Sequence, residues 1–156
     1  MQEACSFRMA SNTYAVDMIF ASYEGGVVSV FLERIKLGAT LSVHGDGEQT
    51  RDFIFVSDIV KANLAALDRG NQETIQIGTS QRTSINEVLS HLSGIHGFNV
   101  ETASTARRDG DIKHSCLCNK KALQLLGWSP EIDIKKGLKE TYFYGQDRLN
   151  SDWGMQ

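Results

Sequence analysis

The sequence predicts an α/β fold, and three observations support this. Short apolar runs typical of β-strands alternate along the 156 residues with segments whose apolar residues recur at helical spacing. Capping residues stand at the ends of the helical segments. Hydrophobic residues make up 41% of the chain and charged residues 22%, a globular composition in a chain long enough to bury a core. The predicted helices span residues 27–37, 58–67, 84–93, 119–126 and 133–145, and the predicted strands 41–44, 53–56, 74–78 and 99–103.

The first predicted helix, over residues 27–37, has apolar residues at positions 27, 28, 31, 32 and 35. Gly38 ends it, as is typical of a helix C-terminus. The apolar run 41–44 then predicts a short strand. This strand leads into a tight turn at Gly45 and Gly47, because glycine supplies backbone angles that other residues avoid.

The apolar run 53–56 predicts the next strand, and Ser57 after it is expected to cap the helix over 58–67. Gly70 stands beyond the end of that helix. Residues 74–78 alternate apolar and polar side chains with period two, which predicts a strand.

The third helix opens with a capping box, because Glu87 follows Ser84 by three positions. A strand over 99–103 follows. The helix over 119–126 is stopped by Gly127 and by Pro130, the only proline.

Charge and composition exclude several kinds of partner. With 16 Lys and Arg against 19 Asp and Glu, the formal net charge of −3 offers no basic surface for nucleic acid or for anionic membranes. No apolar run approaches the roughly 20 residues that span a bilayer, and the N-terminus lacks a signal-peptide pattern. Three cysteines suit a reducing compartment better than a disulfide framework, so we expect a cytoplasmic protein.

A metal site is conceivable at Cys116, Cys118 and His114, but a C-x-C pair with one nearby histidine is a weak signal. Small half-buried residues on a strand or turn explain the same pattern. We expect no metal.

Arg51 and Asp52 stand directly before the apolar run 53–56 and after the glycine turn. An arginine projecting from the start of a rigid strand can bind a phosphate or carboxylate with two hydrogen bonds. The alternative is a local ion pair with Asp52 or Asp58, and the pattern alone favours that alternative.

A second polar cluster, Arg107-Arg108-Asp109-Gly110-Asp111, also combines basic residues with a glycine turn. Alone it is typical of a solvated loop. Together with Arg51 it could hold a diphosphate, while Asp111 accepts hydrogen bonds from ribose hydroxyls.

Several motifs are missing from the sequence. It contains no G-x-G-x-x-G dinucleotide fingerprint, no phosphate-binding G-x-x-x-x-G-K-[ST] and no H-E-x-x-H. A Tyr-x-x-x-Lys pair is also missing, the nearest pattern being Tyr144 with Arg148. We therefore predict no catalytic residue and no cofactor-binding residue.

Three stretches in order, GDGEQTRDFIFVSDIVKANLAAL (45–67), ETIQIGTSQRTSINEVLSHL (73–92) and RRDGDIKHS with KKALQLLGWSP (107–130), resemble one known family. It is the NAD-dependent epimerase/dehydratase family of extended short-chain dehydrogenase/reductases, which includes UDP-glucose 4-epimerase. The resemblance is to its C-terminal, substrate-binding portion. It implies a small mixed α/β domain over residues 25–146 without the N-terminal Rossmann half, a non-family segment 1–24 and a tail 147–156.

The resemblance implies roles for five residues. Arg51 matches the arginine of the family's G-D-G-x-x-x-R-D motif, and Arg108 that of R-x-G-D; both contact the diphosphate of a nucleotide sugar. Asp111 matches the acid that binds the ribose. Ser42 and His44 match the short strand that lies along the base.

The departures from the family decide the expected function. NAD binding and the Tyr/Lys chemistry match no residue here, so the resemblance implies a domain that binds a UDP- or dTDP-sugar, takes no cofactor alone and is inactive alone. Cys118 replaces a usual Asp, and Ser80 a usual Gly. The alternatives are a remnant serving as an oligomerisation or interaction module and an enzyme completed by another chain. In the family the matching strand joins the Rossmann sheet, so the resemblance implies an unpaired edge on strand 74–78, which predicts a homo-oligomer.

Overall fold

A computed structural model of the chain describes residues 12–14, 26–70 and 73–152, with side chains for 26–70 and 73–144. Six short strands and five helices are described. They are β1 (Asn12–Tyr14), α1 (Val27–Lys36), β2 (Leu41–His44), β3 (Thr50–Arg51), β4 (Phe53–Phe55), α2 (Val56–Asp68), β5 (Thr83–Ser84), α3 (Ile85–His96), β6 (Thr102–Thr105), α4 (Lys120–Leu126) and α5 (Ile134–Asp152). The predicted α/β fold class is confirmed.

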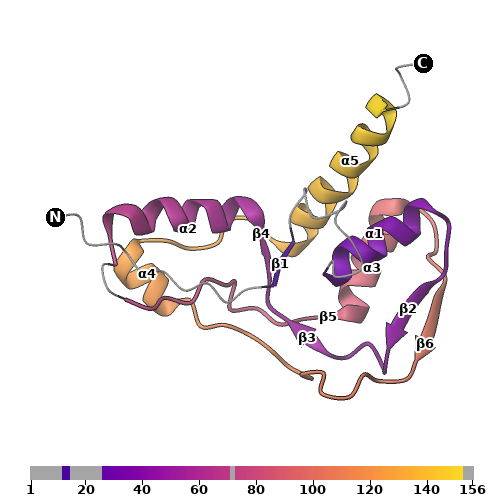
Figure 1. Cartoon of the computed structure of the whole chain (residues 1–156), viewed down its shortest axis with the longest axis horizontal. Coiled ribbons are helices and arrows are strands. Elements are labelled where there is room, and N and C mark those ends of the chain that lie inside the picture. The colour runs from indigo at the N-terminus through magenta and orange to yellow at the C-terminus, as the bar shows by residue number, and fades with distance from the viewer. Residues whose placement is uncertain (1–11, 15–25, 71–72, 153–156) are drawn as a thin grey trace.

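The described strands form three separate two-stranded ladders. β1 pairs with β4 and β2 with β6, both in parallel, while β3 and β5 are antiparallel. In Figure 1, α2 and α4 lie on one side of β4, and α1, α3, β2 and β6 lie on the other. No helix in the described ranges combines the length and the apolar character needed to cross a membrane.

Two hydrophobic cores meet at β4. The α1–α3 core contains Phe53 and Phe55 of this strand, while the α2–α4 core contains Ile54. Successive side chains of a strand point to opposite faces, so this three-residue strand contributes side chains to both cores. The other members of the α1–α3 core are Val28, Phe31, Leu32, Ile35, Leu41, Val43, Ile85, Val88, Leu89, Leu92, Leu138 and Tyr142. Those of the α2–α4 core are Ile59, Ala62, Ala66, Ile75, Ile77, Ala122, Leu126 and Trp128.

Local signals placed several elements correctly. α1 and β2 lie where predicted, and α4 ends at Gly127, whose φ of 67° is left-handed. The capping box of α3 is present: Glu87 N–H donates to Ser84 Oγ (3.1 Å), and Ser84 N–H donates to the Glu87 carboxylate (2.6 Å). The helix continues beyond the predicted residue 93 to His96.

Ser57 does not cap α2, so that prediction is wrong. The helix begins at Val56, directly after β4, and Phe55 is its N-cap residue without a side-chain cap bond. Ser57 therefore lies inside the first helical turn. The N-cap position is taken by Phe55, whose side chain has no hydrogen-bond acceptor.

The strand predicted over 74–78 is also absent from the described residues. Ile75 and Ile77 are buried in the α2–α4 core and Gln76 is exposed, so the alternation correctly indicates burial. These residues pair with no strand among the described ones. The strand predicted over 99–103 instead forms at Thr102–Thr105, where β2 provides its partner.

Candidate functional site

An ion pair between Arg51 and Asp111 lies at the centre of the candidate site. Arg51 Nη2 donates to Asp111 Oδ1 across 2.7 Å, with the side chains 19% and 35% exposed. Arg51 Nη1 also donates to the carbonyl of Thr50 (2.9 Å), which holds the guanidinium against its own strand. The structure thus brings together two of the residues that the sequence proposed for a phosphate and ribose site.

Backbone hydrogen bonds explain how these two residues meet. Thr50 N–H donates to the carbonyl of Lys113 (2.9 Å), and Ser115 N–H donates to the carbonyl of Thr50 (3.0 Å). The hydroxyl of Thr50 also lies 3.1 Å from His114 Nδ1. Segment 113–115 therefore runs alongside β3, and Asp111 arrives opposite Arg51.

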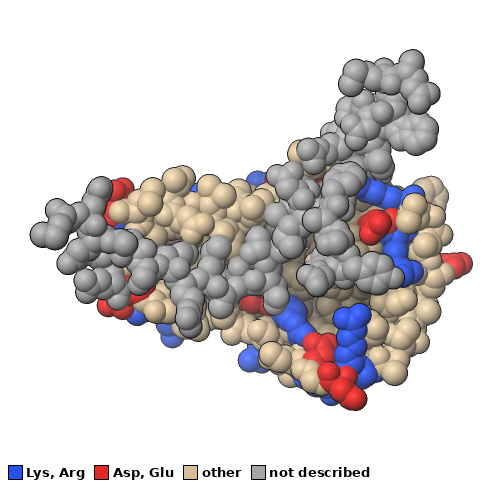
Figure 2. Space-filling view, in the orientation of Figure 1, with Lys and Arg blue, Asp and Glu red and all other residues tan. Residues whose placement is uncertain are grey.

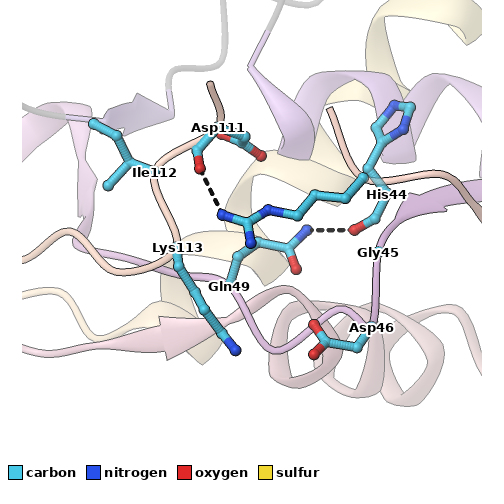
Figure 3. Close-up of a pocket in the computed structure, with 8 residues that line it drawn as sticks. His44, Gly45, Asp46, Gln49, Asp111, Ile112 and Lys113 are labelled. Atoms are coloured by element: carbon cyan, nitrogen blue, oxygen red, sulfur yellow. Dashed lines mark hydrogen bonds between the residues drawn. The ribbon is translucent and has the colours of Figure 1, made fainter. Parts of the chain in front are cut away.

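A cavity of about 150 Å³ adjoins this ion pair. It is lined by residues 44–46, Gln49, Arg107 and residues 111–113. Figure 3 shows the residues of 111–113 on one side and those of 44–46 on the other, with Gln49 between them. The Gln49 amide donates to the His44 carbonyl (2.9 Å), and the Arg107 guanidinium donates to the Asp111 carbonyl (3.0 Å).

Charges of both signs surround the cavity. Figure 2 shows acidic and basic side chains gathered over the region of β2, β3 and β6 in Figure 1. The pKa of Asp46 is lowered, first because Glu48 N–H donates to its carboxylate (3.0 Å) and also because Lys113 and Arg107 are nearby. Arg107 and Lys113 thus add positive charge to a site that already holds Arg51.

The turn beside the cavity requires its glycines. Gly45 and Gly47 have φ of 73° and 74°, in the left-handed region. A Cβ atom on Gly47 would lie 2.1 Å from Asn86 Oδ1, and the Asn86 amide is held by the Asp46 carbonyl (3.0 Å) and the Glu48 carboxylate (2.6 Å). The turn is therefore fixed to the start of α3.

Ser42 and His44 share one half-buried face of β2, because Leu41 and Val43 alternate with them and are buried. His44 lines the cavity, and its Nδ1 lies 2.8 Å from the Thr105 hydroxyl. Ser42 is not among the residues that line it. The sequence placed the two on one strand correctly.

Arg108 is not brought into the ion pair. Its backbone carbonyl accepts from Asp111 N–H (3.3 Å), closing a turn, and the residue is exposed. Arg107 instead lines the cavity, although the sequence did not select it. The sequence shows the two neighbouring arginines, but only the geometry of the turn decides which of them lines the cavity.

The local ion pair expected as an alternative for Arg51 does not form. Asp52 is 2% exposed and accepts hydrogen bonds from backbone N–H groups, and Asp58 is fully buried and accepts from Glu131 N–H and Ile132 N–H. Both carboxylates point into the interior. The sequence favoured a local ion pair of Arg51 but did not indicate that the Asp52 carboxylate accepts hydrogen bonds from backbone N–H groups.

Cys116 lies close to the buried carboxylate of Asp52. The Cys116 thiol donates to Asp52 Oδ2 (3.7 Å), and burial, with the nearby Asp52, raises the pKa of this thiol. Cys118 is exposed. Within the described ranges, no three His, Cys, Asp or Glu side chains group so as to hold a metal ion.

The described residues do not fit NAD. A dinucleotide pyrophosphate needs glycines where a strand passes into a helix, so that the backbone can approach the phosphates. α2 follows β4 at Phe55 and Val56, and α3 follows β5 at Ser84 and Ile85, without glycine at either junction.

Comparison with known proteins identifies relatives of this chain. The model of the "NAD dependent epimerase/dehydratase family" matches residues 3–78, so the match includes most of the segment 1–24. A putative UDP-glucose 4-epimerase of Methanocaldococcus jannaschii is 42% identical over 118 residues, and UDP-glucose 4-epimerase of Mycolicibacterium smegmatis is 35% identical over 119. Each alignment covers 76% of this chain but 38% of the relative.

Solved structures agree with the sequence relatives. The UDP-glucose 4-epimerase of Thermotoga maritima, determined with UDP-glucose, superposes with a TM-score of 0.85 at 36% identity, covering 92% of this chain and 46% of that one. A UDP-N-acetylglucosamine 4-epimerase of Methanobrevibacter ruminantium gives a TM-score of 0.84 at 26% identity, with 91% and 46% covered. The chain thus spans less than half the length of these relatives, and it belongs to the NAD-dependent epimerase/dehydratase family, resembling the substrate-binding C-terminal portion.

Proposed function

We propose that this chain is the part of a nucleotide-sugar epimerase or dehydratase that binds the nucleotide diphosphate of the sugar substrate. The observation that carries the proposal is the Arg51–Asp111 pair beside a cavity to which Arg107 and Lys113 contribute. We assign this binding to residues 25–146; the predicted tail 147–156 begins inside α5, which continues past the predicted helix end at 145 to Asp152.

The chemistry of the site suits a diphosphate joined to a ribose. A guanidinium offers two parallel N–H donors, which match the oxygens of a phosphate. Asp111 supplies a carboxylate that can accept from ribose hydroxyls while it stays close to Arg51. We assign a second guanidinium contact with the diphosphate to the exposed Arg108, and contact with the base to the face of β2 that carries Ser42 and His44.

The relatives support the same ligand class. The Thermotoga maritima epimerase was determined with UDP-glucose, and a UDP-glucuronic acid 4-epimerase of Bacillus cereus with UDP-glucuronic acid and NAD. We extend the nucleotide-sugar ligand, as UDP- or dTDP-sugar, to this chain. We do not extend NAD, because the described residues do not fit it, and we propose that the chain alone is inactive. A cytoplasmic location accords with these proposals.

A second function, as an oligomerisation or interaction module, is favoured by one surface. Val60, Leu64 and Leu67 of α2 are 49%, 59% and 75% exposed and follow one another at helical spacing. Such an apolar stripe is typical of a surface that contacts another protein. Together with segment 74–78, which pairs with no described strand, it supports a homo-oligomer.

Calorimetric titration with UDP, dTDP and UDP-glucose tests the binding function. We expect saturable binding, which Arg51→Ala and Arg108→Ala each weaken by about 1.5–3 kcal/mol, the range of charge-assisted hydrogen bonds. No heat and no thermal shift with any of the three ligands would reject the binding function. Light scattering at micromolar concentration separately tests the oligomer, and a clean monomer would reject it.

A further inference from the structure

The buried carboxylate of Asp52 joins three segments of the chain. Asp52 Oδ1 accepts from Thr79 N–H (2.8 Å) and from the Thr79 hydroxyl (2.5 Å). Asp52 Oδ2 accepts from Ser80 N–H (3.0 Å), Leu117 N–H (3.1 Å) and the Cys116 thiol (3.7 Å). Five donors on one carboxylate, itself 2% exposed, satisfy a buried charge that would otherwise be costly.

The turn that faces Asp52 is built for this contact. Ser80 has φ of 60°, the only described residue other than glycine with positive φ. A Cβ atom on Gly78 would lie 2.8 Å from Asp52 Oδ2 and 2.8 Å from Leu117 Cβ. The Ser80 hydroxyl accepts from Asn119 N–H (3.0 Å), and the Asn119 amide donates to the Gly78 carbonyl (3.1 Å). Strained backbone of this kind persists only where its surroundings fix it.

The contacts of Asp52 continue the alignment that brings Asp111 to Arg51. Thr50 binds the backbone of Lys113 and Ser115, and Asp52, two positions later, binds the backbone of Leu117. Hydrogen bonds at Thr50 and at Asp52 therefore hold residues 50–52 alongside segment 113–117. Arg51 lies between Thr50 and Asp52, and Asp111 lies two positions before Lys113.

We propose that Asp52 is a positioning residue of the nucleotide-sugar site, whose buried carboxylate keeps Arg51 and Asp111 facing each other. The proposal rests on the proposed function for its effect on ligand affinity. The alignment of the two side chains themselves does not depend on a ligand.

The first test measures UDP affinity by calorimetry. Asp52→Asn replaces one acceptor oxygen by an amide group, which cannot accept from the donors that face it. Arg51 would then be displaced, so we expect UDP affinity to fall about tenfold or more, as for the loss of a charge-assisted contact. Asp58→Asn makes the same change in the α2–α4 half, and Leu126→Ala destabilises that half. Both controls should keep affinity within about twofold, because they share no partner with the site.

A second measurement reads the Arg51 guanidinium directly by nuclear magnetic resonance of the ¹⁵N-labelled chain without ligand. Asp111→Asn identifies the signals that change when the pair is broken. Asp52→Asn should change the same signals in the same direction, and Leu126→Ala should leave them in place. Loss of stability alone would not reproduce this pattern.

The outcomes separate the two proposals. If the wild-type chain binds no UDP, the proposed function fails, and the Arg51 signals alone decide the role of Asp52. If Asp52→Asn leaves those signals unchanged, or lowers affinity no further than the two controls, Asp52 only stabilises the fold and the inference is wrong.

Should Asp52→Asn not fold, Thr79→Val replaces it. This variant removes one of the five donors, and Thr141→Val, which removes a buried hydroxyl from α5, is its control. Thr79→Val should shift the Arg51 signals and weaken UDP binding measurably, while Thr141→Val should do neither. Equal behaviour of the two variants would overturn the inference.

Discussion

The guanidinium of Arg51 lies 2.7 Å from the carboxylate of Asp111, although 60 positions of sequence separate the two residues. Both side chains remain partly exposed, so the pair contributes little to folding, about 0–1 kcal/mol. Their arrangement matters more for ligand binding than for folding, because two side chains that are already in place can bind a phosphate and a ribose.

Arg51→Lys should separate binding from stability. Lysine keeps the positive charge but loses the planar pair of donors, so UDP affinity should fall, by less than the about 1.5–3 kcal/mol expected for Arg51→Ala. Calorimetry measures the affinity, and urea denaturation should show a stability change below about 1 kcal/mol. Arg34→Lys, on the exposed face of α1, is the matched control, and wild-type affinity of Arg51→Lys would contradict a two-donor contact.

The two glycines of the turn beside the cavity should differ in their tolerance of alanine. Both have positive φ, so each substitution costs about 1 kcal/mol of backbone strain. A Cβ on Gly45 meets only Arg107 carbons at 3.7 and 3.9 Å, whereas a Cβ on Gly47 displaces Asn86. Gly47→Ala should therefore cost about 1–3 kcal/mol more in urea denaturation, because Asn86 loses hydrogen bonds. Equal costs would show that Asn86 moves freely.

The capping box of α3 predicts a pH dependence of stability. Ser84 N–H and the Ser84 hydroxyl lower the pKa of Glu87. A lowered pKa stabilises the folded chain above the ordinary pKa of glutamate, about 4.3, and this contribution is lost as pH falls through the folded value.

Glu87→Gln keeps the box but removes the charge. It should be less stable than wild type at pH 7 by under about 1 kcal/mol, since the side chain is exposed. Urea midpoints of the two proteins should converge as pH falls below the ordinary glutamate pKa and through the lowered pKa of folded Glu87. A difference that stays constant between pH 7 and pH 3 would show that the charge contributes nothing.

Two cysteines should differ in reactivity. Burial and Asp52 raise the pKa of Cys116, whereas Cys118 is exposed. Because the thiolate is the reactive form, iodoacetamide at about pH 8 should modify Cys118 well before Cys116. Peptide mass spectrometry measures both rates, with the urea-unfolded chain as control. Faster modification of Cys116 would contradict its burial against Asp52.

Sequence signals that depend on a few neighbouring residues were sufficient for much of the fold. Gly38 and Gly127 end their helices as predicted, and the Ser84–Glu87 box begins α3. Ser57 shows the limit of such signals, because α2 begins one residue earlier, at Val56, and Phe55 takes the N-cap position. Ile75 and Ile77 show another: alternation reports burial, but a strand also needs a partner for its backbone.

The candidate site depended on contacts that no local pattern contains. The resemblance to the family brought Arg51 and Asp111 together, while the residues alone favoured a local pair with Asp52 or Asp58. Asp52 was missed because its donors come from Thr79, Ser80 and Leu117, far along the chain. Choosing between Arg107 and Arg108 required the turn closed by Asp111 N–H.

The three residues of β4 bear on how the chain unfolds. Phe53 and Phe55 pack into one core and Ile54 into the other, so neither core can open without exposing part of its neighbour. We expect amide hydrogens in α3 and in α2 to share one slowest exchange rate, that of a single cooperative transition. The halves that this strand joins should behave as one folding unit.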